Sequence, residues 1–215
     1  MSEKLSIPGP VGPLEALLDS PQASMPATAT ARERVGVVCH PHPLYGGTMT
    51  NKVAHILART FAELGAHAIR FNFRGVGASA GEYAEGVGET DDALAVVEWA
   101  TKRWPNAELW LAGFSFGGAV AIRASVAWPQ VARLVTVAPA IDRVAVDSSR
   151  LPRCPWLLVQ GDRDDLVDPT RIRTWAAELE RPPTIAWLEG AEHFFHGRLN
   201  DVRDAIVDWV GGETA

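Results

Sequence analysis

One serine of the chain lies in a pattern that suits nucleophilic chemistry. Ser115 stands in the run GFSFGG (residues 113–118), between an apolar, strand-like stretch and a helix-like stretch. A serine at such a turn is held at the tip of a tight bend, and the flanking glycines let the backbones approach closely. Because a free hydroxyl is a weak nucleophile, the pattern predicts catalysis only if a base and an acid stand elsewhere.

An aspartate and a histidine follow two later strand-like runs. Asp164 comes after residues 155–160, and His193 comes after residues 184–188. The carboxyl ends of parallel strands meet at one edge of a sheet, so these two side chains and Ser115 are expected to converge there. The chain order Ser, Asp, His is that of a nucleophile-elbow triad, which predicts a nucleophile, an orienting acid and a general base in that order.

Both the acid and the base have competitors nearby. Asp162 and Asp165 flank Asp164 in the same acidic loop, which is alternatively a solvated turn or a weak calcium site. His196 lies three residues after His193. We read His196 as structural, with contact to substrate at the rim of the site as the alternative.

The run HPHPLYGG (residues 40–47) follows an early strand-like stretch, where a second oxyanion donor is expected. Its two prolines have no N–H group, which leaves the backbone of His42, Leu44 or Tyr45. We favour Leu44 and then Tyr45, together with the N–H of Phe116. The two histidines have no third ligand near them in the sequence, so we expect no metal site.

The chain resembles the α/β-hydrolase superfamily, and within it the small, uncapped bacterial serine hydrolases that are similar to dienelactone hydrolase. The resemblance covers about residues 33–210 and rests on the runs CHPHPLYGGTMTNKV, RFNFRGVGASAG and GFSFGG, and on the pair GDRDDLV and GAEHFFHG. It implies Ser115 as nucleophile, His193 as general base and Asp164 as the orienting acid. It also implies one α/β domain with no cofactor.

The remaining pattern supplies elements to hold these residues. Residues 5–20 predict an antiparallel hairpin, and residues 24–32 predict a loop. From residue 35 onward, strand-like and helix-like runs alternate, with a helix capped by Asn51 and another beginning at Asp91. Such alternation predicts a single domain over residues 1–215, with a mostly parallel sheet and helices on both faces.

The connection after the strand-like residues 131–137 is short. Only residues 138–154 separate it from the next strand. The resemblance places a cap domain at this point in many relatives, and 17 residues are too few for one. We therefore expect no cap and an open cleft.

Composition narrows the expected partners. The net charge is −6 and the hydrophobic content is 47%, with no basic run. Nucleic acid and anionic membranes are therefore not expected, and no apolar run approaches the roughly 18 residues that span a bilayer. Cys39 and Cys154 suggest no disulfide framework, and no signal peptide is visible, which favours a cytoplasmic location. We expect a monomer or a small homo-oligomer.

Several functions fit this pattern. We favour hydrolysis of a small carboxylic ester or thioester through an acyl-enzyme. A small-peptide hydrolase or acyltransferase with the same triad is the alternative, and a non-catalytic binding module is a third.

The glycine-rich run at residues 74–81 looks like a dinucleotide fingerprint, but further glycines follow it where the fingerprint requires a helix, so we expect a structural turn.

Overall fold

The computed structural model describes residues 2–22 and 33–212, in which eight strands form one sheet of order β1-β2-β4-β3-β5-β6-β7-β8. The first two strands and the β2–β4 pair are antiparallel, and all other neighbours are parallel. The strands are β1 (Glu3–Gly9), β2 (Gly12–Asp19), β3 (Arg34–Cys39), β4 (Ala66–Phe71), β5 (Glu108–Phe114), β6 (Val131–Val137), β7 (Trp156–Gly161) and β8 (Thr184–Leu188).

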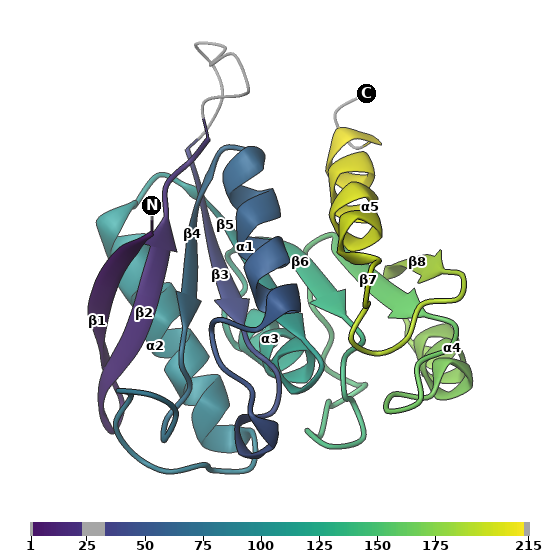
Figure 1. Cartoon of the computed structure of the whole chain (residues 1–215), viewed down its shortest axis with the longest axis horizontal. Helices are drawn as coiled ribbons and strands as arrows, with labels where there is room; N and C mark the ends of the chain where they lie inside the picture. Colours follow the sequence, from purple (N-terminus) through teal and green to yellow (C-terminus); the bar gives the residue numbers. More distant parts are fainter. Residues whose placement is uncertain (1, 23–32, 213–215) are drawn as a thin grey trace.

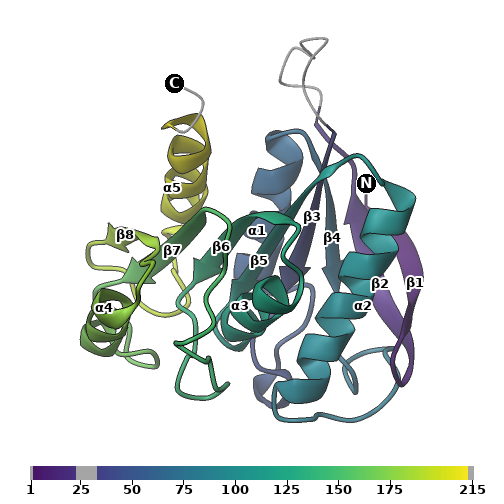
Figure 2. The same cartoon turned by 180° about the vertical axis from the view of Figure 1, so that it is seen from behind.

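Helices cover both faces of the sheet, as the alternating pattern predicts. Helices α1 and α5 lie in front of the sheet in Figure 1, whereas α2, α3 and α4 lie in front in the reverse view of Figure 2. Two buried clusters follow this division, one for each face. The helices are α1 (Lys52–Glu63), α2 (Val87–Arg103), α3 (Phe116–Ala127), α4 (Pro169–Glu178) and α5 (Leu199–Gly212), with a 3-10 turn η1 at Pro43–Tyr45.

The predicted N-terminal hairpin is confirmed, and its two strands lie at one edge of the sheet. In β2, Leu14, Ala16 and Leu18 are buried while their neighbours are half-exposed or exposed. This alternation of two suits a strand with one face on the core. The interior strands β5 and β7 are buried on both faces, as expected for parallel strands under two helical layers.

Local signals place most helix ends. The side chain of Asn51 accepts hydrogen bonds from the N–H groups of Val53 and Ala54, which caps α1 as predicted. The expected start of α2 at Asp91 was wrong by four residues. The helix begins at Val87 because the carboxylate of Glu89 accepts hydrogen bonds from two backbone N–H groups just before it.

The connection between β6 and β7 contains no helix or strand over residues 138–155. The predicted absence of a cap is therefore confirmed. The loop expected at residues 24–32 lies outside the described residues. Cys39 and Cys154 are free thiols, and none of the helices in the described ranges is long and apolar enough to cross a membrane.

Candidate active site

Ser115 occupies a strained turn between β5 and α3. Its φ of 55° lies in the left-handed region, which a residue with a side chain adopts at a cost. The two glycines around it allow the turn to close. A Cβ on Gly113 would lie 2.0 Å from the carbonyl oxygen of Gly117, and one on Gly117 would lie 2.3 Å from that of His40. The predicted elbow is thus present in the backbone, and it places Ser115 at the carboxyl edge of the sheet.

The structure brings Ser115, His193 and Asp164 together. The Nε2 atom of His193 lies 3.1 Å from Ser115 Oγ, and its Nδ1 atom lies 2.8 Å from Asp164 Oδ2. An ionised carboxylate only accepts hydrogen bonds, so Nδ1–H donates to Asp164 and Nε2 is free to accept from the serine hydroxyl. His193 and Asp164 are only 3% and 5% exposed, which shields this chain from water.

Four donors hold the carboxylate of Asp164. The N–H groups of Leu166 and Val167 donate to Oδ1 at 2.9 and 2.7 Å, and Gln160 Nε2 donates to Oδ2 at 3.1 Å, beside His193. Hydrogen bonds of this kind fix the carboxylate in one orientation. Gln160 was missed in the sequence, because a glutamine at the end of a buried strand carries no signal until the loop folds back over it.

The neighbouring aspartates make no hydrogen bond to His193. Asp162 accepts a hydrogen bond from the N–H of Gly190, and Asp165 is exposed. Asp168 caps α4 by accepting a hydrogen bond from the N–H of Thr170 at 2.8 Å. The geometry therefore favours Asp164 over its neighbours as the partner of the histidine.

His196 lies apart from this hydrogen-bond chain. Its side chain is 64% exposed, and its Nδ1 atom lies 3.7 Å from Glu192 Oε2. Together with Phe194 it lines a small depression next to the main cleft. This exposed position matches the alternative of a rim residue rather than the favoured structural role, and His196 makes no hydrogen bond to Ser115.

In the loop after β3, the two N–H groups expected to be available for an oxyanion already make hydrogen bonds. The N–H of Leu44 donates to His42 Nδ1 at 3.2 Å, and the N–H of Tyr45 donates to the carbonyl oxygen of His42 at 3.1 Å. The preference for Leu44 and then Tyr45 is therefore not supported by the loop's hydrogen bonds. In the described part of the chain, the N–H groups of His42 and Phe116 have no hydrogen-bond acceptor, and both residues line the same pocket.

Backbone groups hold the rings of both histidines of this loop. His40 Nε2 accepts a hydrogen bond from the N–H of Phe73 at 3.0 Å, and its Nδ1 lies 2.6 Å from the carbonyl oxygen of Pro41. Burial lowers the pKa of His40 to about 4, so its ring is neutral near pH 7. Burial, and then the charge of Arg143, lower the pKa of His42. Among the described residues, no group of three or more His, Cys, Asp and Glu side chains is placed to hold a metal ion.

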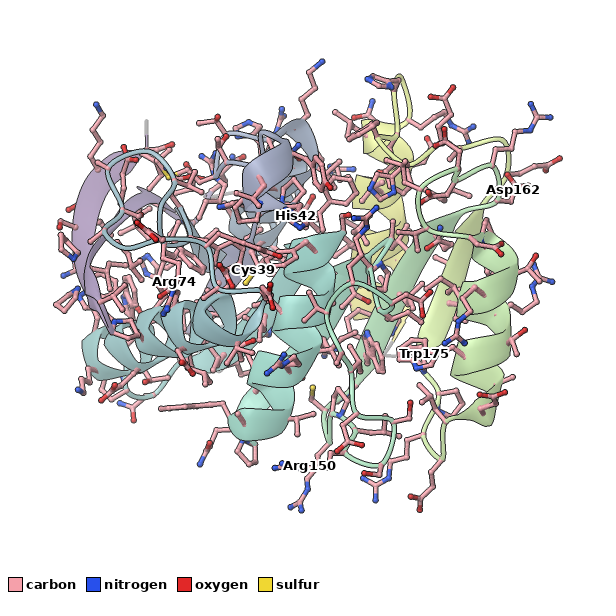
Figure 3. The ribbon with its side chains drawn as sticks, turned by 90° about the horizontal axis from the view of Figure 1, so that it is seen from below. Cys39, His42, Arg74, Arg150, Asp162 and Trp175 are labelled. Carbon is pink, nitrogen blue, oxygen red and sulfur yellow. The ribbon has the colours of Figure 1, made fainter. Side chains whose placement is uncertain are left out.

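Ser115 and His193 line a pocket of about 350 Å³. Figure 3 looks onto this edge of the sheet, with His42 near the centre of the molecule. Phe116 and Tyr45 line the pocket as expected, whereas Leu44 is 67% exposed and does not line it. The lining residues are Pro41, His42, Tyr45, Gly46, Gly47, Asn51, Ser115, Phe116, Ala140, Arg143, Leu166, Val167, His193 and Phe194.

The glycine-rich run at residues 74–81 is a turn beside this pocket. Arg74 Nη2 lies 2.7 Å from Asp92 Oδ1, and the backbone N–H of Arg74 also donates to the Asp92 carboxylate at 2.9 Å. Arg74 thus ties the turn to α2, and the expected structural turn is present. No helix opens directly after the run, because α2 begins only at Val87, so a dinucleotide site is not supported.

Comparison with known proteins relates this geometry to a family. The family model described as serine aminopeptidase, S33, matches residues 44–151, which include Ser115. An uncharacterised protein of Rickettsia prowazekii is 33% identical over 185 residues, which cover 82% of this chain and 78% of that protein.

Two solved structures are similar over nearly the whole chain. One is a serine hydrolase without a lid from Xanthomonas campestris, with 41% identity and a TM-score of 0.88, covering 97% of this chain and 94% of that one. The other is an α/β serine hydrolase homologue from Coxiella burnetii, with 40% identity and a TM-score of 0.86, covering 96% of both chains. Both likenesses extend past Ser115 to the segments that hold Asp164 and His193.

Proposed function

Because this chain belongs to the α/β-hydrolase superfamily, among its serine hydrolases without a lid, we propose that it cleaves small carboxylic esters or thioesters through an acyl-enzyme. The observation that carries the proposal is the chain of hydrogen bonds from Ser115 through His193 to Asp164, at the wall of an open pocket. That arrangement supplies a nucleophile, a base and a group that orients the base.

In the proposed acylation step, Ser115 Oγ attacks the carbonyl carbon of the ester. His193 Nε2 takes the hydroxyl proton, and Asp164 stabilises the resulting imidazolium through the hydrogen bond from Nδ1–H. The same proton then passes to the departing alcohol or thiol. Water, activated by His193, attacks the acyl-serine in the second step and releases the acid.

The negative charge of the tetrahedral intermediate needs two donors. We assign this role to the backbone N–H groups of Phe116 and His42, because both residues line the pocket and neither N–H group has an acceptor among the described residues. Phe116 is also the first residue of α3, where the helix dipole adds positive potential. Each donor of this kind typically contributes about 2.7–4 kcal/mol to stabilisation of the transition state.

A peptidase is the alternative that the description of the matching family model favours. An aminopeptidase has to hold the ammonium group of a peptide N-terminus, for which a carboxylate is the natural partner. No described residue that lines the pocket carries a carboxylate, and Arg143 lines it instead. A cation at this position disfavours an ammonium group, so we place ester hydrolysis first.

The test is a comparison of three substrates with the purified protein. We expect turnover of p-nitrophenyl butyrate and of a butyryl thioester, little turnover of leucine p-nitroanilide, and loss of all of it in Ser115→Ala. Transfer to added alcohols would appear as a new ester and would indicate an acyltransferase. Cleavage of the anilide faster than both esters would contradict the proposal, as would full activity of Ser115→Ala.

A further inference from the structure

Arg143 is a positively charged side chain in the lining of the pocket that holds Ser115. Among the described residues that line this pocket, it is the one with a formal charge at neutral pH, since the pKa of His42 is lowered and the other lining residues are uncharged or belong to the hydrogen-bonded chain. The surroundings are largely apolar, with Tyr45, Leu166 and Phe194 exposed at the rim. An arginine in such a setting is available for a ligand of opposite charge.

The backbone around Arg143 is anchored to the nucleophile. Arg143 lies in the short connection that takes the place of a cap. The N–H of Ala140 donates to the carbonyl oxygen of Ser115 at 3.0 Å, and the N–H of Arg143 donates to the carbonyl oxygen of Ala140 at 3.0 Å. Val144 is buried and packs where a Cβ on Gly86 would collide with it. The base of the arginine side chain is therefore fixed relative to the reacting hydroxyl.

The guanidinium of Arg143 has no carboxylate partner among the described residues. Its neighbour Asp142 pairs instead with Arg171 of α4 at 3.2 Å. The carboxylate of Glu89, whose charge also acts on His42, is occupied by two backbone N–H groups at 2.8 and 2.7 Å. The guanidinium lies 5.7 Å from the centroid of the Tyr45 ring, a contact that orients it and leaves N–H donors free.

The sign of this charge matters in a protein that is otherwise acidic. The chain has a net charge of −6, whereas the charged side chain that lines this pocket is positive. A guanidinium presents a planar fork of N–H donors that matches the two oxygens of a carboxylate.

We propose that Arg143 forms a carboxylate subsite, and that the substrates are esters carrying a free carboxylate on their acyl or alcohol part. This inference rests on the proposed function of the same pocket. It names monoesters of short dicarboxylic acids, or esters of hydroxycarboxylic acids, as the substrate class. The reaction remains hydrolysis at Ser115, and the carboxylate itself undergoes no chemical change.

Two pairs of esters test the inference and separate its two forms. For the acyl side, mono-p-nitrophenyl glutarate is compared with p-nitrophenyl valerate. For the alcohol side, the butyrate ester of meta-hydroxybenzoate is compared with that of meta-hydroxybenzamide. The variants are Arg143→Gln and Arg143→Lys, with Arg150→Gln as control, since Arg150 is an exposed arginine of the same connection that lies well away from His42 in Figure 3.

We expect one pair to show a kcat/KM ratio of charged to neutral ester that falls about tenfold in Arg143→Gln, as for loss of a charge-assisted hydrogen bond in a partly open site. Arg143→Lys should restore part of the ratio, Arg150→Gln should match the wild type, and added salt should weaken the preference. Equal ratios in the wild type and Arg143→Gln for both pairs would overturn the inference, even with neutral esters hydrolysed at Ser115.

A binding measurement keeps this test separate from the proposed function. Isothermal titration calorimetry of the Ser115→Ala variant with monomethyl glutarate should show binding. This binding should be lost in the double variant that also carries Arg143→Gln. Binding that persists in the double variant, or no binding to Ser115→Ala at all, would contradict the subsite. Failure of the proposed function would appear differently, as hydrolysis of neutral esters that is absent or independent of Ser115.

Discussion

At the scale of single residues, the site depends on the hydrogen bonds that the carboxylate of Asp164 accepts. Asp164 receives four donors, so its remaining freedom is small and its acceptor Oδ2 stays on the histidine. That bond selects the imidazole tautomer with the proton on Nδ1, which leaves Nε2 of His193 facing Ser115 as an acceptor. The chemistry that we propose thus depends on a carboxylate that never reacts.

The first prediction concerns this carboxylate. Asp164→Asn should lower kcat by about 10⁴-fold, because an amide can stabilise the wrong tautomer and carries no charge to balance an imidazolium. The measurement is ester turnover at saturating substrate, with thermal unfolding to show that the variant is folded.

Asp165→Asn is the matched control, since Asp165 is an exposed neighbour in the same loop. It should retain most of the wild-type turnover. An active Asp164→Asn beside an inactive Asp165→Asn would show that we have assigned the acid to the wrong residue.

Ser115, Asp164 and His193 could be predicted because each lies in the loop or turn that follows a strand, and strand ends in a parallel sheet converge. The oxyanion loop could not be predicted to the same depth. The side chain of His42 turns back to accept the N–H of Leu44, and its carbonyl oxygen accepts the N–H of Tyr45. Such local hydrogen bonds depend on the turn's dihedral angles, which the sequence HPHPLYGG does not reveal.

At the scale of elements, the turn between β5 and α3 stores strain that the surrounding structure holds in place. Ser115 adopts a φ of 55°, and its N–H donates to the carbonyl oxygen of Val137 in β6 at 2.9 Å. The start of α3 packs so closely on the end of β3 that glycine is required at position 117. The elbow is therefore a junction of three strands and a helix rather than an isolated turn.

The second prediction tests this close approach. Gly117→Ala places a Cβ 2.3 Å from the carbonyl oxygen of His40 and 2.5 Å from that of Cys39, and neither backbone can move freely. We expect a loss of at least about 1–3 kcal/mol in the free energy of unfolding, as for other overpacked sites, together with a large loss of activity. Urea unfolding and ester turnover measure the two effects.

Gly211→Ala provides the control, because a Cβ at this position of α5 meets nothing within 4 Å. This change should keep activity and stabilise the helix by up to about 1 kcal/mol. If Gly117→Ala were as stable and active as Gly211→Ala, the close packing of α3 on β3 would not be required.

Most element types could be predicted from apolar periodicity, but one boundary depended on a distant interaction. The carboxylate of Glu89 caps α2 from within, and Asp92 is buried where it binds Arg74 of the preceding turn. The helix start expected at Asp91 was therefore wrong, because its neighbour Asp92 is buried within α2. A charged residue that pairs across a loop cannot be told from a cap by local sequence.

At the scale of the whole molecule, the short connection over residues 138–155 leaves the carboxyl edge of the sheet uncovered. In Figure 1 the arrows of β3, β6 and β7 point toward the lower side of the molecule, where loops follow them. The likeness to a serine hydrolase without a lid agrees with this arrangement. Short connections were predictable from residue counts alone, because no cap fits in so few residues.

The third prediction follows from the uncovered edge. With no lid to open, turnover should not rise when a p-nitrophenyl ester passes from monomers to micelles. Each buried CH₂ contributes about 0.8 kcal/mol, or about fourfold in kcat/KM, so preference should increase over the first few acyl carbons and then level off in a pocket of about 350 Å³. Kinetics with esters of increasing length, below and above the critical micelle concentration, provide the measurement.

A sharp rise at the micelle point, with specificity still increasing at long chains, would contradict the open cleft. It would require a deep acyl tunnel or a cover supplied from outside the described residues.

The most direct test of the central claim is peptide mapping by mass spectrometry after reaction with a fluorophosphonate probe. We predict a single adduct on the peptide that contains Ser115, no adduct in Ser115→Ala, and normal labelling in Ser125→Ala, where a buried serine of the same helix α3 is removed. An adduct on another residue, or equal labelling of Ser115→Ala and the wild type, would contradict the account.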